Sequence, residues 1–337
     1  MTNIDYGKII SRSWEITKKN KWLWIYGLIL AAAGGGGNFS GGGGGGGNFQ
    51  ASPSGTLKDN LTAIPSGFVD NATQVLGATT NALMEWFFSV SPLTWILVVI
   101  AVVFSVLFLV IIGVILQNWA KGALIAGLQM AANNETVTLL NTSPRGISSL
   151  KNLIIYSSIE FLVFLVLAIL SLLLIGLFFL LGTVSPVMAV VVTILGAIVG
   201  GLTLIVVLLL LAMVNIYAQR LIVIKGYSPW QAWKQALAMS KKSFLETIVM
   251  GIINLVIGCV AGCLTTIVSL IIVGVPALIL LIPQFRDGFH LPGVPTIILL
   301  GLLILVFVHI NLVVRAIIVI FNYANWNLFF EEVIKNE

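Results

Sequence analysis

The sequence contains little charge, since Lys, Arg, Asp and Glu together make up 9% of its 337 residues. Soluble domains carry about 25% charged residues, so this composition excludes an ordinary water-soluble globular protein. Hydrophobic residues make up 59% of the chain. Several apolar runs exceed the roughly 18 residues that can span a bilayer as a helix. The predicted fold class is all-α, a polytopic helical membrane protein. Because basic residues flank membrane helices, the net charge of +5 does not indicate nucleic-acid binding.

Cysteine and histidine are also scarce, with two of each. Cys259 and Cys263 lie four residues apart within an apolar run, without a nearby histidine or carboxylate. A zinc site needs about four ligands, and positions one turn apart on a helix fit a disulfide poorly. We therefore expect packing residues, with no metal and no cofactor. The sequence also lacks the motifs H-E-x-x-H, G-x-S-x-G, C-x-x-C and the P-loop, which favours a protein that is not an enzyme.

Hydropathy predicts about six transmembrane helices plus interfacial amphipathic helices. The six segments are Trp22 to about Gly37, Leu93 to about Leu116, Leu153 to about Leu181, Val187 to about Ile216, Ile248 to about Val273, and Ile297 to about Phe321. The predicted domains are an amphipathic helix at 1–21, a six-span membrane domain at 22–321 and a tail at 322–337, with loops at 34–91, 117–152 and 217–247. Pro276 leaves two alternatives for Gly274–Ile282, a kinked continuation of the fifth span or a re-entrant piece.

The distribution of positive charge predicts the orientation. Of the 17 Lys and Arg residues, all but Lys58 and Arg286 fall on one side of the six predicted spans. The positive-inside rule then places both termini, the loops 117–152 and 217–247 and the tail in the cytoplasm. We therefore expect a multi-pass protein of the cytoplasmic membrane, N-in and C-in. A cleavable signal peptide ending at Ala31-Ala32-Ala33 is the alternative for the N-terminus.

The external loop 34–91 begins with glycine runs between Gly34 and Gly47. A phosphate-binding loop follows a strand, opens a helix and often carries a lysine, whereas this run follows an apolar segment and its nearest lysine is Lys58. Glycine orders at a high entropic cost and has no side chain to bury, so we interpret the run as flexible chain. The rest of the loop predicts one or two amphipathic helices on the outer interface.

Two segments that precede apolar spans look alike. They are "DYGKIISRSWEITKKNKW" near the N-terminus and "YSPWQAWKQALAMSKKSF" before the fifth span, and they align without a gap at an offset of 223 residues, from Trp14 to Leu237. Both predict amphipathic helices; Ser228 and Pro229 form a helix-start signal in the second. A fainter third copy is "SPRGISSLKNLIIY" before the third span. The alternatives are an internal repeat and chance similarity produced by positive-inside selection.

Such helices lie in the headgroup plane, with aromatic residues at the acyl boundary and lysines on anionic headgroups. The bilayer and its anionic lipid headgroups are therefore the predicted partners, together with a membrane-protein partner or a second copy of the chain. The predicted lipid-interface residues are Trp14, Lys18, Lys19, Trp22, Trp230, Trp233, Lys241 and Lys242.

The stretches Trp14 to Trp24 and Trp230 to Phe244 carry a family resemblance. With their "W…KKN…W" and "AW…A…SKKSF" patterns, they make the chain resemble the glycerophosphoryl diester phosphodiesterase membrane-domain family, a group of uncharacterised bacterial polytopic proteins. The resemblance implies a helical membrane module whose role is poorly known. It does not imply hydrolysis, because this chain has no soluble domain to carry that reaction.

Ionisable residues inside a membrane are costly, so each one is a candidate site. Glu160 and Arg315 lie at about the same depth, roughly 12 and 9 Å from the cytoplasmic ends of their spans. The alternatives are a Glu160–Arg315 ion pair, snorkelling of Arg315 to the headgroups, and a proton or substrate relay that includes His309. Asn311 shares a helix face with Arg315, and in the relay alternative this face lines a cavity. We also expect Asn215 and Asn254 to hydrogen bond between helices.

Glycines spaced by four let helix backbones approach closely, which predicts packing or dimerisation at Gly196 and Gly200 and at Gly258 and Gly262. Together these features predict a non-enzymatic module that organises lipids or partner proteins. The alternative is a small transporter or channel that uses Glu160, His309 and Arg315 in an intramembrane cavity.

Overall fold

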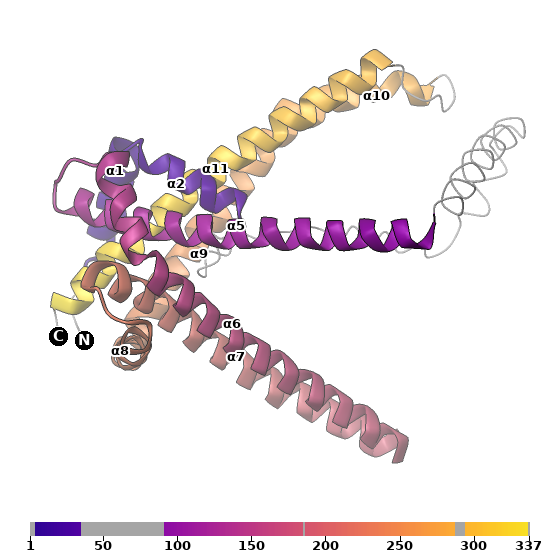
Figure 1. Cartoon of the computed structure of the whole chain (residues 1–337), viewed down its shortest axis with the longest axis horizontal. Coiled ribbons are helices and arrows are strands. Elements are labelled where there is room, and N and C mark those ends of the chain that lie inside the picture. The colour runs from indigo at the N-terminus through magenta and orange to yellow at the C-terminus, as the bar shows by residue number, and fades with distance from the viewer. Residues whose placement is uncertain (1–3, 35–90, 185, 287–293, 336–337) are drawn as a thin grey trace, which may run out of the picture. The chain divides into compact units, whose positions relative to one another are not determined.

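The computed structural model describes residues 4–34, 91–184, 186–286 and 294–335. The regular structure of these residues is helical (Figure 1). The elements are α1 (Tyr6–Lys19), α2 (Leu23–Ala32), α5 (Pro92–Ala132), α6 (Leu139–Val184), α7 (Pro186–Lys225), α8 (Pro229–Lys242), α9 (Phe244–Ser269), the π-helical turn η2 (Leu270–Gly274), α10 (Val275–Arg286) and α11 (Val294–Lys335). The glycine runs, the amphipathic helices predicted before residue 91 and His290 lie outside the described residues.

Five helical stretches of the described chain are long and apolar enough to cross a membrane, as expected for a multi-pass membrane protein. They are Leu93–Ala132, Leu139–Leu177, Ile198–Lys225, Phe244–Ile282 and Pro295–Lys335. The predicted count of six is not confirmed. The first predicted span forms α2, whose 10 residues cover about 15 Å, half of a bilayer core. Its side chains Leu23, Tyr26 and Leu30 are buried, so α2 belongs to the protein core.

Three long helices continue well past the predicted ends of their spans. α5 runs to Ala132, α7 to Lys225 and α11 to Lys335, so the tail predicted from residue 322 is helical and largely buried. Hydropathy marks the end of a span where polar residues begin, but backbone hydrogen bonding does not depend on that change. Tertiary packing in the core stabilises these helical continuations, which contain many residues of low helix propensity such as Asn, Tyr and Phe.

The stretch around Pro276 is a continuation of the fifth span and not a re-entrant piece. α9 passes through η2 into α10, and the N–H of Val275 donates to the carbonyl oxygen of Leu270, five residues back. Proline has no N–H and its ring crowds the preceding turn, so an ordinary α-helical turn cannot close there. The π-helical turn takes up this mismatch and keeps the helix continuous.

The two similar segments form matching helices, α1 and α8. Their bounds coincide at the predicted offset, since Tyr6 falls on Pro229 and Lys19 on Lys242. The buried residues coincide as well: Ile9, Ser13, Ile16 and Thr17 in α1, and Ala232, Ala236, Met239 and Ser240 in α8. The helix-start signal is confirmed, because the Gln231 side chain accepts from the N–H of Ser228 at 3.3 Å. The two helices therefore bury the same face, which includes small and polar residues and leaves Trp14 and Trp230 exposed.

The fainter third copy, Ser143–Tyr156, lies within α6, and the first part of this helix, residues 139–152, corresponds to α1 at an offset of 133. Here Thr142, Gly146 and Ser149 are buried, 133 residues after Ile9, Ser13 and Ile16 of α1. The charged positions agree too, because Lys151 follows Lys18 at the same distance. We refer to α1, residues 139–152 and α8 as the three amphipathic segments.

Each amphipathic segment packs against the C-terminal end of a long helix. We call these ends, residues 113–132 of α5, 213–225 of α7 and 316–335 of α11, the return ends. Residues 139–152 pack on α5, where a Cβ added to Gly146 would lie 2.8 Å from Ala123 Cβ. α8 packs on α7. α1 packs on α11, where the centroids of the Tyr6 and Phe329 side-chain rings are 6.5 Å apart. We call the three amphipathic segments with their three return ends the ring.

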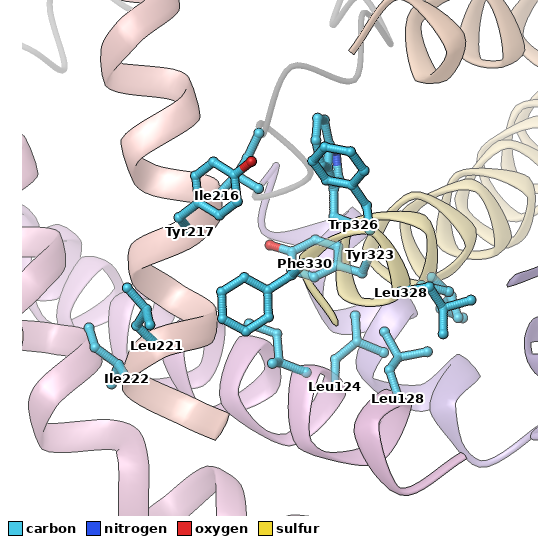
Figure 2. Packing of buried hydrophobic residues seen from close by; sticks show 14 of the residues in the cluster. Leu124, Leu128, Ile216, Tyr217, Leu221, Ile222, Tyr323, Trp326, Leu328 and Phe330 are labelled. Carbon is cyan, nitrogen blue, oxygen red and sulfur yellow. The ribbon is translucent and has the colours of Figure 1, made fainter. Parts of the chain in front are cut away.

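The hydrophobic core lies where the three return ends meet. Figure 2 shows Leu124 and Leu128 of α5, Tyr217 and Leu221 of α7, and Phe330 of α11 gathered around one centre. By contrast, the most apolar windows of α6 and α11 bury none of their residues inside the chain, and those of α7 and α9 bury 17% and 11%. The return ends and the amphipathic segments therefore supply the intramolecular packing, and most of the apolar span surface is left for the bilayer.

Candidate functional site among the return ends

A chain of polar side chains connects α6 with α7. Glu160 Oε1 accepts from Asn215 Nδ2 at 2.6 Å, and Asn215 Oδ1 accepts from Gln219 Nε2 at 2.7 Å. Asn215 and Gln219 are buried and lie one turn apart on one face of α7. The ammonium of the half-buried Lys121 on α5 interacts electrostatically with Glu160. Three long helices thus meet around one carboxylate.

Arg220 is the largest fully buried side chain of the described residues. Its Nη1 donates to the carbonyl oxygen of Ile216 at 2.7 Å and its Nη2 to that of Tyr323 at 3.4 Å, with the guanidinium 5.8 Å from the Tyr323 ring centroid. No ion pair with a carboxylate joins it within the described part of the chain. A buried cation needs compensation. Backbone oxygens and an aromatic face supply it here, and they tie α7 to α11.

Asparagines make two further cross-links to α11. Asn325 Nδ2 donates to Asn254 Oδ1 on α9 at 2.8 Å, and Asn327 Nδ2 donates to the carbonyl oxygen of Ile125 on α5 at 3.0 Å. The hydrogen bonds of Asn215 and Asn254 to neighbouring helices confirm the prediction for both residues. The return ends are thus joined by polar groups as well as by apolar packing.

The structure does not bring Glu160, His309 and Arg315 together. Arg315 is exposed on α11, and the charge that interacts with Glu160 is Lys121. His309 is exposed, with Nδ1 2.7 Å from the carbonyl oxygen of Leu305. Asn311 donates to the carbonyl oxygen of Phe307 at 2.8 Å and to Ser269 Oγ at 3.3 Å. Equal depth did not make Glu160 and Arg315 neighbours, because α6 packs on α7 whereas α11 packs on α9.

The predicted lipid-interface residues lie mostly on the outside of the amphipathic segments. Trp14, Trp22 and Trp230 are 48%, 52% and 58% exposed, whereas Trp233 is half-buried against Tyr156, with 6.3 Å between ring centroids. Lys18, Lys19, Lys241 and Lys242 are exposed. A lysine ammonium lies over each of two exposed indoles, Lys18 over Trp14 at 5.5 Å and Lys234 over Trp230 at 5.4 Å. We call the exposed residues of the predicted set the rim: Trp14, Trp22, Trp230, Lys18, Lys19, Lys241 and Lys242.

A hydrogen bond links α1 to the start of α9. The Tyr6 hydroxyl donates to the backbone oxygen of Glu246 at 3.4 Å. Burial and the negative charge of Glu246 raise the pKa of Tyr6, so its hydroxyl stays protonated around neutral pH.

Three of the four predicted packing glycines have space around them. A Cβ added to Gly200, Gly258 or Gly262 would meet no heavy atom within 4 Å. Close approach occurs at other glycines. A Cβ on Gly27 would lie 2.7 Å from Ile320, and one on Gly122 would lie 2.5 Å from Ser149 Oγ. Spacing by four therefore did not identify the glycines that bring helices together. Cys259 and Cys263 are exposed free thiols.

A polar cavity of about 490 Å³ opens beside the core, between α1 and the return ends. Lys8, Arg12 and Lys225 contribute positive charge and Glu331 and Glu332 negative charge. Several of these groups have partners: Arg12 donates to the carbonyl oxygen of Ala132 at 2.7 Å, and Glu331 accepts from Gln129. No group of three His, Cys, Asp or Glu side chains suited to a metal ion occurs in the part of the chain that the structure describes.

The sequence contains a pattern that marks the return ends, which the hydropathy analysis did not identify. An aromatic residue, an alanine and a polar residue occur together three times, as Trp119-Ala120-Lys121, Tyr217-Ala218-Gln219 and Tyr323-Ala324-Asn325. In each copy the alanine is fully buried or nearly so. The polar residue of each triplet contributes to the contacts described above, so this short pattern marks where the long helices meet.

No protein-family model, curated protein or solved structure matches the chain. The resemblance to the glycerophosphoryl diester phosphodiesterase membrane-domain family therefore stays a prediction.

Proposed function

We propose that this chain is a non-enzymatic integral membrane protein that gathers anionic phospholipids at the cytoplasmic face of a bacterial plasma membrane. The observation that carries the proposal is that α1 and α8 each have one face packed in the core and another face exposed. Each helix buries one face against a return end and leaves indoles and lysines exposed. The core therefore holds the rim in place while its lysines and these tryptophans stay exposed.

The chemistry of the rim fits a lipid interface. Indole rings prefer the headgroup level of a bilayer, and a lysine near an anionic membrane surface contributes about 1 kcal/mol of attraction. Four lysines, Lys18, Lys19, Lys241 and Lys242, belong to the rim. Fixed on rigid helices, they attract several anionic headgroups at once. The proposed orientation, with both termini in the cytoplasm, rests on the positive-inside rule and requires a sixth crossing at the predicted first span.

The test measures enrichment of anionic lipid around the protein. The full chain is reconstituted into phosphatidylcholine vesicles that contain a minor fraction of labelled phosphatidylglycerol, and energy transfer from the protein to the lipid reports local concentration. We expect enrichment that falls with added salt and falls severalfold when the four rim lysines become glutamine. A control variant, Lys225→Gln with Lys335→Gln, removes positive charge outside the rim and keeps the enrichment. Equal enrichment in wild type and the rim variant contradicts the proposal.

Transport is a second candidate, favoured by the polar chain of Glu160, Asn215 and Gln219 with Lys121 nearby. Membrane transporters place such groups where helices meet and are often built from repeats. The measurement is ion or solute flux in proteoliposomes. Flux above that of empty vesicles, abolished by Glu160→Gln, favours transport over the lipid-gathering role.

A further inference from the structure

At three junctions the helix that follows an amphipathic segment meets a return end, and at two of them a glycine allows close contact. Gly27 brings α2 onto α11, since its Cβ would lie 2.8 Å from the carbonyl oxygen of Ala316. Gly122 brings α5 onto α6, where its Cβ would lie 3.1 Å from Leu153. Both glycines are explained by close contact.

The third junction, between α7 and α9, is different. The C-terminal part of α7 contacts the N-terminal part of α9, where the hydroxyls of Tyr217 and Thr247 are 2.7 Å apart. Beyond this contact a groove of about 80 Å³ stays open between apolar side chains of both helices. Gly251 of α9 lines it, and a Cβ added there would meet no heavy atom within 4 Å.

One wall of the groove carries a polar group without a partner. Trp326 of α11 lines the groove, is 2% exposed, and its Nε1 makes no hydrogen bond within the described chain. A buried N–H is normally paired. The lining of the groove is mostly apolar, so it suits a ligand that is apolar along its length.

Positive charge lies next to the groove along α9. Lys241 and Lys242 are exposed directly before this helix begins, and the groove residues Thr247 to Leu255 follow. At 1.5 Å per residue the groove extends from about 7 to about 20 Å beyond Lys242. This range matches the distance from a lipid phosphate into its acyl region, since the hydrocarbon core begins about 5–8 Å inside the headgroup surface.

We propose that the groove between α7 and α9 binds one acyl chain of an anionic glycerophospholipid whose phosphate contacts Lys241 and Lys242. The inference rests on the proposed function and names a specific site for it. Gly251 leaves room for the chain. The other two junctions, where the glycine is already in contact with protein, bind no such chain.

The experiment measures lipid binding to the full chain in mild detergent by native mass spectrometry, with titrations of phosphatidylglycerol, phosphatidylcholine and oleate. We expect one phosphatidylglycerol to bind at least tenfold more tightly than the others. Gly251→Leu fills the groove and lowers this affinity at least tenfold. Gly301→Leu is the matched control, because Gly301 also has no heavy atom within 4 Å and lies on α11 away from the groove. Lys241→Gln with Lys242→Gln reduces phosphatidylglycerol binding to the phosphatidylcholine level.

Two outcomes overturn the proposal. One is unchanged phosphatidylglycerol affinity in Gly251→Leu, or in Leu255→Trp if the first variant does not fold. The other is oleate binding as tightly as phosphatidylglycerol and independently of the two lysines, which identifies a fatty-acid site. The groove and the rim fail separately, because Gly251→Leu keeps the bulk enrichment measured in vesicles. Loss of that enrichment in the wild type contradicts the proposed function itself.

Discussion

Replacing Gly27 by alanine tests whether α2 is a packed part of the core. The added Cβ would lie 2.7 Å from both Ile320 Cγ1 and Cδ1 and 2.8 Å from the carbonyl oxygen of Ala316. Carbon atoms meet at about 3.5–4.0 Å, so the contact is repulsive. Ile320 is fully buried and the carbonyl belongs to the backbone of α11, so neither can move aside easily. Overpacking of this kind costs about 2 kcal/mol.

The gain in helix propensity offsets part of this cost. Alanine is favoured over glycine in a helix by about 1 kcal/mol, which leaves Gly27→Ala destabilised by about 1 kcal/mol. Gly258→Ala has the same propensity gain and meets no heavy atom within 4 Å. We therefore expect the two variants to differ by about 2 kcal/mol in unfolding free energy. Helix unfolding by increasing denaturing detergent in mixed micelles, followed by circular dichroism, measures the difference. A Gly27→Ala protein as stable as Gly258→Ala refutes the packing of α2 on α11.

Three other predictions concern the polar contacts among the return ends. Arg220→Lys loses about 1.5–3 kcal/mol of unfolding free energy, because a single ammonium cannot bridge the carbonyl oxygens of Ile216 and Tyr323. An Arg220→Lys variant with the stability of the wild type contradicts this cross-link between α7 and α11. A double-mutant cycle of Asn254→Ala and Asn325→Ala gives a coupling of about 0.6 kcal/mol, as is usual for hydrogen bonds between membrane helices, and strictly additive effects show that the bond is absent. The effects of Glu160→Gln and Arg315→Gln on unfolding free energy are additive within about 0.5 kcal/mol, whereas those of Glu160→Gln and Lys121→Gln are coupled. The reverse result supports an ion pair between Glu160 and Arg315.

Local features of the fold were predictable from the sequence. The start of α8 follows from Ser228 and Pro229, which act within one turn of the helix. The helical state of α1 and α8 follows from their periodicity, but their buried faces do not, because Trp14 and Trp230 are exposed whereas Ser13, Thr17 and Ser240 are buried. The interhelical bonds of Asn215 and Asn254 follow from the cost of leaving an amide unpaired in an apolar environment.

Lateral neighbours were not predictable in the same way. Hydropathy gives only the depth of a residue along the membrane normal. Glu160 and Arg315 have about the same depth, but their helices α6 and α11 do not pack on each other there. The same limit applies to glycine: Gly27 and Gly258 look alike in an apolar run, but only the first meets another helix. The ten residues of α2 are apolar for two different reasons, membrane insertion and core packing, and composition does not separate these.

The closure of the ring by α1 on α11 sets an order for biogenesis. α1 leaves the ribosome before α11, which provides its docking surface, and the contacts of Tyr6 with Phe329 and of Trp14 with Phe321 join residues more than three hundred positions apart. During translation the apolar side of α1, with Ile9 and Ile16, has no protein surface to cover it until α11 has been made. A nascent chain stalled before α11 therefore leaves that side to the membrane surface or to a chaperone, and release of α1 from either one reports that synthesis of the helix core is complete.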